Sequence, residues 1–195
     1  MKVRASRVKA RFCNSTKPKL QKNNVFMRKV IALVVVMACA MSMMAESRTL
    51  VAYFSATGRT KAVAQDIARV NGFDLWEIEA YEPYTAADLN WRDAQSRSSI
   101  EMADSTERPT IRICTDLRPY DTIYVGFPIW WGICPRIIQS WVENNILDDK
   151  VLIPFATSGS STIDKAVQFL RSTYPQYNWQ DGFLLNNYTE KAIKF

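Results

Sequence analysis

Short runs of apolar, β-forming residues alternate with segments of helical periodicity, and this alternation restricts the fold more than any other feature. The runs at 49–54, 122–126 and 151–156 are almost wholly apolar, as are strands buried on both faces of a parallel sheet. Apolar positions then repeat at helical spacing in three later segments, at 61–70, 135–145 and 161–172. We therefore expect an α/β fold with a parallel sheet and right-handed crossovers.

Two further segments complete the expected sheet. Residues 74–80 alternate apolar and polar side chains, which predicts a strand near the sheet edge, and residues 182–185 predict a fifth strand. This alternation of strands and helices predicts a doubly wound, five-stranded parallel sheet of order 2-1-3-4-5 with helices on both faces. Because only ten residues follow Leu185, the last helix is expected to be short or missing. The domain is expected to span residues 46–195.

The segment between Tyr81 and Asp121 is long for a connection in such a fold. Thr85 and Asp88 are placed to cap a short helix, and the rest of the segment has no clear periodicity. Connections of this length are uncommon and often functional. The segment is a candidate lid over a ligand or a candidate partner-binding segment; the alternative is a solvated connector with Trp91 packed on the sheet.

Charge separates the first 45 residues from the remainder. Residues 1–45 contain ten Lys and Arg and no acidic residue, whereas residues 46–195 contain fifteen Lys and Arg against nineteen Asp and Glu. The net charge of +6 therefore comes from the N-terminal segment, and the globular part carries −4. Such a mildly acidic domain gives no electrostatic basis for binding nucleic acid, so nucleic acid is not expected as a partner.

The N-terminal segment has the layout of an export signal. Arg28 and Lys29 precede the apolar stretch 30–38, and small residues follow as far as Ala45. This pattern predicts a secretory signal peptide, and the alternatives are an uncleaved membrane anchor or a lipidated Cys39.

The residues before this signal are basic, polar and without periodicity. We expect Met27 to be the true start of the chain; a long basic extension is the alternative. The protein is expected to be periplasmic or membrane-anchored if the signal is used and cytoplasmic otherwise. Any membrane contact is expected only through residues 1–45.

The chain contains no histidine and four cysteines, none of them in a CxxC pair. The commonest general base and metal ligand is therefore missing, and zinc or iron–sulfur ligation is not expected. Cys114 and Cys134 lie in the globular part, where buried thiols are favoured over a disulfide. No catalytic acid or base and no metal site are predicted.

Three loops rich in small, hydroxyl-bearing or aromatic residues follow the first, third and fourth expected strands. Residues 55–60 (Ser-Ala-Thr-Gly-Arg-Thr) form a strand-to-helix turn suited to an anion; an ordinary helix start is the alternative. The second loop places Trp130 beside Trp131, and we expect one ring to cover the sheet and the other to reach a planar ligand. The third loop is Thr-Ser-Gly-Ser-Ser at 157–161. The carboxyl ends of parallel strands share one edge of the sheet, so the loops predict a single site.

These loops resemble those of the flavodoxin-like family, which includes FMN-binding flavodoxins and NAD(P)H-dependent flavin oxidoreductases. Residues 53–60 resemble the phosphate loop (S/T)-x-T-G-x-T, residues 126–132 resemble the loop that packs on the flavin, and residues 155–159 resemble the second flavin-side loop. The resemblance implies FMN as the cofactor. It implies that the phosphate is bound by Ser55, Ala56, Thr57, Gly58, Arg59 and Thr60, and that the isoalloxazine is flanked by Pro128, Ile129, Trp130, Trp131 and Gly132 on one side and by Thr157, Ser158 and Gly159 on the other.

The sequence departs from the family pattern in two ways that bear on function. No aromatic residue occurs at 157–161, so one flavin face is expected to be open or covered from elsewhere. No acidic residue lies between Phe127 and Ile138, and Arg136 is near. Because acidic side chains disfavour the anionic hydroquinone, we expect a less negative potential than that of a low-potential carrier.

The resemblance implies an FMN-binding redox protein that transfers electrons through a non-covalently bound flavin. Its partner would be a redox protein or a small-molecule electron acceptor. One alternative is an FMN-dependent NAD(P)H (quinone) oxidoreductase. A second is a non-redox module that binds a phosphate ligand or a partner on the same fold. The sequence leaves the redox partner and the oligomeric state open.

Overall fold

The computed structural model describes residues 48–112 and 115–195. The expected signal peptide or anchor at 1–45 and the thiol of Cys114 lie outside these residues. None of the helices in the two described ranges combines the length and the apolar character that crossing a bilayer demands.

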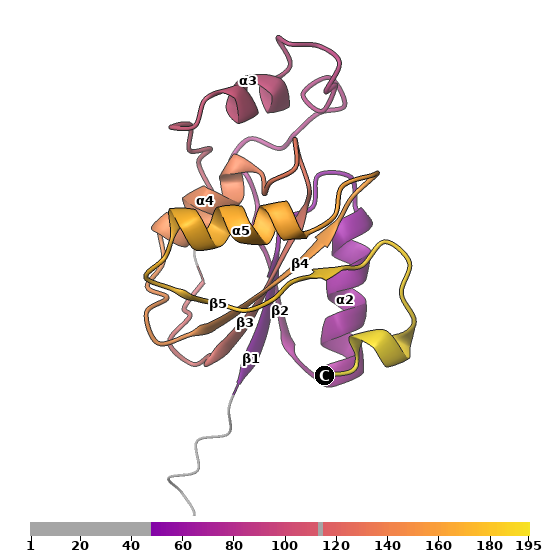
Figure 1. Ribbon diagram of the computed structural model, residues 1–195, viewed down its shortest axis with the longest axis vertical. Coiled ribbons are helices and arrows are strands. Elements are labelled where there is room, and N and C mark those ends of the chain that lie inside the picture. Colours follow the sequence, from indigo (N-terminus) through magenta and orange to yellow (C-terminus); the bar gives the residue numbers. More distant parts are fainter. Residues whose placement is uncertain (1–47, 113–114) are drawn as a thin grey trace, which may run out of the picture. The chain divides into compact units, whose positions relative to one another are not determined.

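A parallel sheet forms the centre of the domain (Figure 1). Its strands are β1 (Thr49–Tyr53), β2 (Asp74–Glu77), β3 (Thr122–Pro128), β4 (Val151–Thr157), β5 (Asn178–Trp179) and β6 (Phe183–Leu184). The order is β2-β1-β3-β4-β5, β6 also pairs with β4, and every pair of strands is parallel. The predicted doubly wound order is confirmed.

The fifth position of the sheet holds two short strands instead of one. β5 pairs with the start of β4, and β6 pairs with its end. The carbonyls of Leu152 and Ala156 in β4 accept hydrogen bonds from the amides of Gln180 and Leu185. Alternate residues of a strand point to the same side, so the backbone of Pro154 also faces β5 and β6. Pro154 has no amide hydrogen to donate, and the pairing is interrupted opposite it. The strand expected at 182–185 therefore corresponds to β6, and β5 was not predicted.

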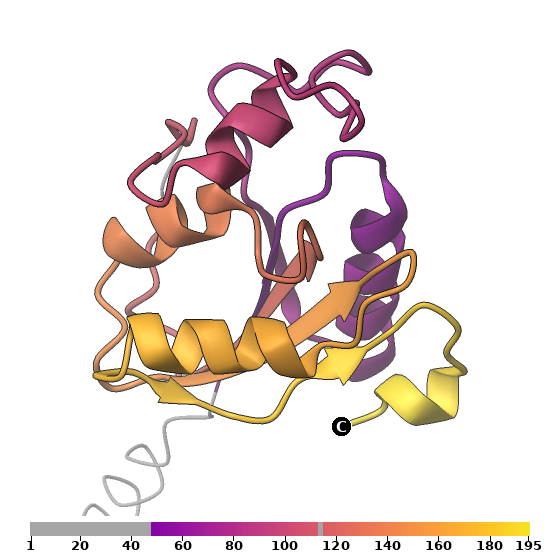
Figure 2. The ribbon, with the colours of Figure 1, turned by 45° about the horizontal axis from the view of Figure 1, so that its top comes forward.

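Helices cover both faces of the sheet (Figures 1 and 2). On one face, α4 (Arg136–Glu143) and α5 (Asp164–Thr173) pack against the core side of β1, β3 and β4. On the other face, α2 (Arg59–Asn71) buries Val63, Ala64 and Ile67, which repeat at helical spacing. The helices predicted after β1, β3 and β4 are therefore present.

The C-terminal residues take the place of a last helix. Only one 3-10 turn, η1 (Glu190–Ile193), follows β6, and Ile193 is buried in the same core as α2. The Asn71 side chain donates to the Ile193 carbonyl at 2.7 Å and accepts from the Phe195 amide at 2.8 Å. The Phe195 ring stacks on Tyr124, with the ring centroids 4.8 Å apart. The expectation of a short or missing last helix is correct, and these contacts cover the sheet in its place.

The long segment after β2 contains a helix, but not where the capping residues predicted it. The Thr85 hydroxyl donates to Asp88 at 2.7 Å and accepts from the Asp88 amide at 3.2 Å, yet this pair closes only a turn. Helix α3 (Arg97–Ala103) begins later, after Ser96, whose hydroxyl accepts from the Ser99 amide. Asn90 and other turn-forming residues follow the first capping pair and prevent a helix there.

Candidate functional site

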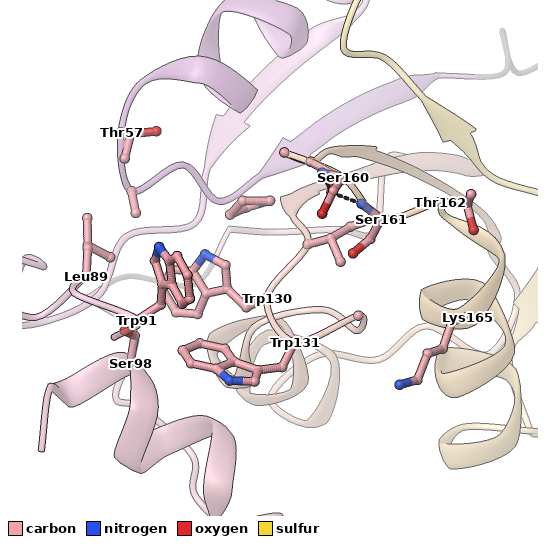
Figure 3. Close-up of a pocket in the computed structure, with 16 residues that line it drawn as sticks. Thr57, Leu89, Trp91, Ser98, Trp130, Trp131, Ser160, Ser161, Thr162 and Lys165 are labelled. Carbon is pink, nitrogen blue, oxygen red and sulfur yellow. Dashed lines mark hydrogen bonds between the residues drawn. The ribbon is translucent and has the colours of Figure 1, made fainter. Parts of the chain in front are cut away.

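A pocket of about 890 Å³ lies where β1, β3 and β4 end, a volume within the range of cofactor and small-molecule sites. Figure 3 shows the side chains around it. Most of the residues predicted from the three loops line it, namely Ala56, Thr57, Pro128, Ile129, Trp130, Trp131, Gly132, Ser158 and Gly159. The structure therefore brings the three loops together around a single cavity, as the shared edge of the sheet predicted.

Seven further residues line the pocket, and three of them come from the segment that the sequence offered as a candidate lid. Leu89, Trp91 and Ser98 reach the pocket from the segment that carries α3, and Ser160, Ser161, Thr162 and Lys165 reach it from the loop after β4 and the start of α5. Trp91 is 65% exposed, so the alternative in which it packs on the sheet is wrong. The sequence carries no local signal for Lys165, because only the packing of α5 beside the second loop brings it to the cavity.

The remaining predicted site residues are Ser55, Gly58, Arg59, Thr60 and Thr157, which do not line this pocket. Thr60 and Thr157 are buried and share a hydrogen bond of 2.9 Å between their hydroxyls. This buried hydrogen bond joins the first loop to the third loop. Gly58 occupies the N-cap position of α2, where it has no side chain to bond the first amides of the helix. Arg59 begins that helix with an exposed side chain.

The N-terminus of α2 has the features of an anion site. Gly58 has a φ of 85°, offers no side-chain cap, and precedes a first turn without acidic residues. The first amides of a helix have no partner within it and carry partial positive charge. The Ser55 hydroxyl is buried and has no hydrogen-bond partner within 48–112 and 115–195. A donor left free beside an uncapped helix end fits a bound anion.

Trp131 and Gly132 form the tip of a small hairpin in the second loop. The backbone of Trp130 and Ile133 exchanges two hydrogen bonds, each 3.0 Å long. Trp131 has a φ of 48° and Gly132 a φ of 87°, the pattern of a type I′ turn. In the described part of the chain, Trp131 is the one non-glycine residue with a positive φ. Such a conformation costs about 1–3 kcal/mol and is found most often at functional sites.

The two adjacent tryptophans have different surroundings. The Trp130 ring meets Phe54 edge-to-face at 5.8 Å and Tyr84 at 5.5 Å, so these two side chains hold it against the core. The Trp131 ring is 48% exposed. Trp130 therefore covers the end of the sheet, whereas much of Trp131 remains open to a ligand.

A buried carboxylate joins two parts of the segment that carries α3. Glu101 accepts hydrogen bonds from the Tyr84 hydroxyl and from Nε of Arg97, each at 2.6 Å. The Arg97 guanidinium also lies over the Tyr84 ring, 4.0 Å from its centroid. Burial, together with the bond to Glu101, raises the pKa of Tyr84 above its usual value. These contacts join α3 to Tyr84, and the Tyr84 ring packs edge-to-face on Phe54 and Trp130 outside the segment.

Arg136 does not supply positive charge to the pocket, contrary to expectation. Its buried side chain turns away and donates to the backbone carbonyls of Glu101 and Met102 and to the Gln139 side chain. It thus joins the end of α3 to α4. The charged residue that lines the pocket is Lys165.

The flavodoxin family model matches residues 48–194. The chain belongs to the flavodoxin family. Among solved structures, a candidate flavoprotein from Bacteroides eggerthii DSM 20697 is 46% identical, with a TM-score of 0.75 over 76% of this chain and 94% of that one. A candidate flavoprotein from Bacteroides uniformis ATCC 8492 is 48% identical, with a TM-score of 0.74 over 76% and 96%.

A more distant flavodoxin-like structure is a flavoprotein in complex with FMN from Lactobacillus acidophilus NCFM. It is 23% identical, with a TM-score of 0.59 over 71% of this chain and 93% of that one, so the likeness concerns the fold. No curated protein matches the sequence.

The pocket of this flavodoxin-family domain is neutral apart from one cation. Among the residues that the structure describes, none that lines the pocket is acidic, and Lys165 is the only charged one. Cys134 lies beneath the second loop as a buried free thiol, and burial raises its pKa to about 12. It is therefore not a thiolate nucleophile at neutral pH. The described ranges hold no group of His, Cys, Asp and Glu suited to a metal ion.

Proposed function

We propose that the protein binds FMN non-covalently and transfers electrons through it to a redox partner protein or a small-molecule acceptor. The observation that carries this proposal is a pocket lined at one end by Ala56 and Thr57, just before the N-terminus of α2, and further along by Trp130 and Trp131. An anion site at one end and aromatic surfaces beyond it fit a ligand with a phosphate and a flat ring.

The phosphate end of the site consists of the β1–α2 turn. The Ser55 hydroxyl, the amides of the first turn of α2 and the Thr57 hydroxyl would donate to the phosphate oxygens. Gly58 leaves open space, since a Cβ built there meets no atom within 4 Å. Thr60 keeps this turn in position through its bond to Thr157.

The ring end of the site consists of the second and third loops. Trp130, Trp131 and Gly132 would flank the isoalloxazine on one side, and Ser158 and Gly159 on the other. FMN, when bound, supplies reversible one- or two-electron chemistry. The absence of acidic lining residues and the presence of Lys165 favour the anionic reduced ring, so the potential is less negative than that of a low-potential carrier.

The similar proteins support a flavin as the cofactor. The two Bacteroides proteins are candidate flavoproteins, and the fold relative from Lactobacillus acidophilus is a complex with FMN.

The test is FMN uptake by the full-length chain. Purified protein incubated with FMN and then desalted should be yellow and should quench the flavin fluorescence. Ser55→Ala should weaken FMN binding, because it removes the free buried hydroxyl, whereas the exposed Ser172→Ala should not. A colourless protein that takes up no FMN would contradict the proposal and favour a non-redox module.

A second candidate function is an FMN-dependent NAD(P)H oxidoreductase, for example a quinone reductase. The observation in its favour is that the pocket extends past the third loop, which has no aromatic residue, to Thr162 and Lys165. An open flavin face could receive a nicotinamide or a quinone. The test is anaerobic addition of NADPH and then a quinone to the FMN-loaded protein. If NADPH does not bleach the flavin absorbance, this candidate fails.

The proposal includes export directed by residues 1–45. It is supported by the sequence pattern of the basic and apolar segments around residues 28–38. Cell fractionation of the full-length chain tests it. Recovery of all the protein in the cytoplasm, at full length, would contradict export.

A further inference from the structure

Two exposed indoles from different segments line the same pocket as the proposed flavin site (Figure 3). Trp91 comes from the segment that carries α3, and Trp131 from the hairpin tip. They are 65% and 48% exposed, whereas Trp130 is held by its edge contacts with Phe54 and Tyr84. Trp91 and Trp131 therefore retain aromatic surface that the core does not use.

Both indoles have features beyond exposure that bear on a ligand. The backbone of Trp131 lies in a turn conformation that a non-glycine residue adopts only at a cost. The Arg92 guanidinium lies over the Trp91 ring, 4.8 Å from its centroid. Exposed aromatic surface gathered in a pocket is a feature of ligand sites. These two rings suit a flat aromatic ligand.

Lys165 adds one positive charge to this part of the pocket. A Cβ placed on Gly132 would lie 3.3 Å from its Nζ, so the ammonium is beside the hairpin tip. Its Nζ makes no ion pair or hydrogen bond with any residue in the described ranges, and no acidic residue lines the pocket. The ammonium therefore suits an anionic group on the ligand.

The position of Lys165 separates this charge from the phosphate end of the site. Thr57 and Lys165 lie at opposite ends of the pocket (Figure 3). A phosphate at the N-terminus of α2 would be held by Thr57 and Ser55 and could not also pair with Lys165. The pocket therefore has places for two anionic groups, one at each end.

We infer that Trp91, Trp131 and Lys165 form a subsite for a second ligand, a planar aromatic molecule that carries an anionic group. The inference rests on the proposed function, because it places this ligand beside the flavin. Trp91 contacts the ring of the second ligand, and Trp131, one face of which flanks the isoalloxazine in the proposed function, contacts the same ligand with its other face. Lys165 pairs with the anionic group of the second ligand. Trp91 thus makes the segment that carries α3 part of the substrate site.

The test compares two probes on the FMN-loaded, full-length protein. Anthraquinone-2-sulfonate is planar and anionic, and 2-(hydroxymethyl)anthraquinone is a planar, uncharged match. Calorimetry should show tighter binding of the sulfonate. Lys165→Met should weaken the sulfonate alone by about fivefold, and Trp91→Leu should weaken both probes by a similar factor. The controls are Lys194→Met and Tyr81→Leu, which change exposed residues outside the pocket.

FMN titrations of the same variants separate this inference from the proposed function. Affinity for oxidised FMN, whose isoalloxazine is uncharged, should be unchanged by Lys165→Met and Trp91→Leu. If Trp91→Leu abolishes FMN binding, Trp91 belongs to the flavin site and the inference is overturned while the proposed function stands. The inference alone is also overturned if the protein binds FMN but does not distinguish the two probes. A wild-type chain that takes up no FMN overturns both.

Discussion

The hydroxyls of Thr60 and Thr157 share a buried hydrogen bond of 2.9 Å between residues 97 positions apart in the sequence. Thr60 lies in the first turn of α2, and Thr157 ends β4. The bond therefore joins the loop at the phosphate end of the pocket to the loop at its ring end.

Removing both of these hydroxyls should destabilise the domain by less than the sum of the two single removals. Thr60→Val leaves the Thr157 hydroxyl buried without a partner, and the free energy of unfolding should fall by about 1–3 kcal/mol. The double variant Thr60→Val with Thr157→Val should lose less than the sum of the single variants, because no polar group is left unpaired. Urea denaturation of the four proteins measures this. Strictly additive losses would show that the bond has no energetic role.

Replacing Trp131 with asparagine should stabilise the ligand-free protein and weaken FMN binding. Asparagine tolerates the positive φ at this turn position, so the melting temperature should rise by an amount equivalent to about 1 kcal/mol. The matched control Trp131→Leu also removes the indole but keeps an unsuitable residue in the turn. It should weaken FMN binding without the gain in stability. Thermal melts and FMN titrations test this, and an unchanged FMN affinity in both variants would contradict it.

Removing the Glu101 carboxylate should release the segment that carries α3. Glu101→Ala leaves Nε of Arg97 and the Tyr84 hydroxyl without their partner and so separates α3 from Tyr84, and the expected loss of stability is about 2 kcal/mol. Limited trypsin digestion should then cut faster at Arg92, which the segment exposes. Glu107→Ala is the control, since that side chain is exposed and makes no bond within the described residues. Equal cleavage rates in the two variants would refute this role of Glu101.

The Cys134 thiol should make the domain less stable at alkaline pH. Burial raises its folded-state pKa to about 12, whereas an unfolded cysteine ionises near 8.5. Between these values the unfolded state loses a proton that the folded state keeps. Stability is therefore unaffected below the unfolded pKa and falls as pH rises through this window, by up to about 1.4 kcal/mol per pH unit.

Comparison with Cys134→Ala isolates this contribution from those of other groups. Relative to Cys134→Ala, the wild type should lose stability as the pH rises from 8 to 10. At pH 8 a thiol reagent should label the two folded proteins equally and the unfolded wild type by one additional thiol. Labelling of Cys134 in the folded protein would show that the thiol is accessible.

The strand order could be predicted from the sequence because each central strand is a continuous apolar run. The segments at 49–54, 122–126 and 151–156 need apolar cover on both faces, which only the interior of a parallel sheet provides. The loops that follow such strands lie at one edge for topological reasons, so their convergence on one pocket could also be predicted.

Other features depend on contacts between residues distant in the sequence. Trp91 and Lys165 reach the pocket through the packing of their segments, and nothing in their immediate neighbours indicates it. Arg136 was expected near the ligand because it is close to the tryptophans in sequence, but the free carbonyls at the end of α3 are its partners. The Thr85 and Asp88 bonds do form, yet local capping does not decide whether a helix continues.

Pro154 has a consequence for the behaviour of the molecule in solution. Because it divides the fifth position, this edge of the sheet consists of two strands of only two residues each. An uninterrupted edge strand is a template on which another polypeptide can form β-structure, and natural proteins commonly interrupt such edges. One missing amide hydrogen in an interior strand thus protects the outer margin of the sheet from aggregation.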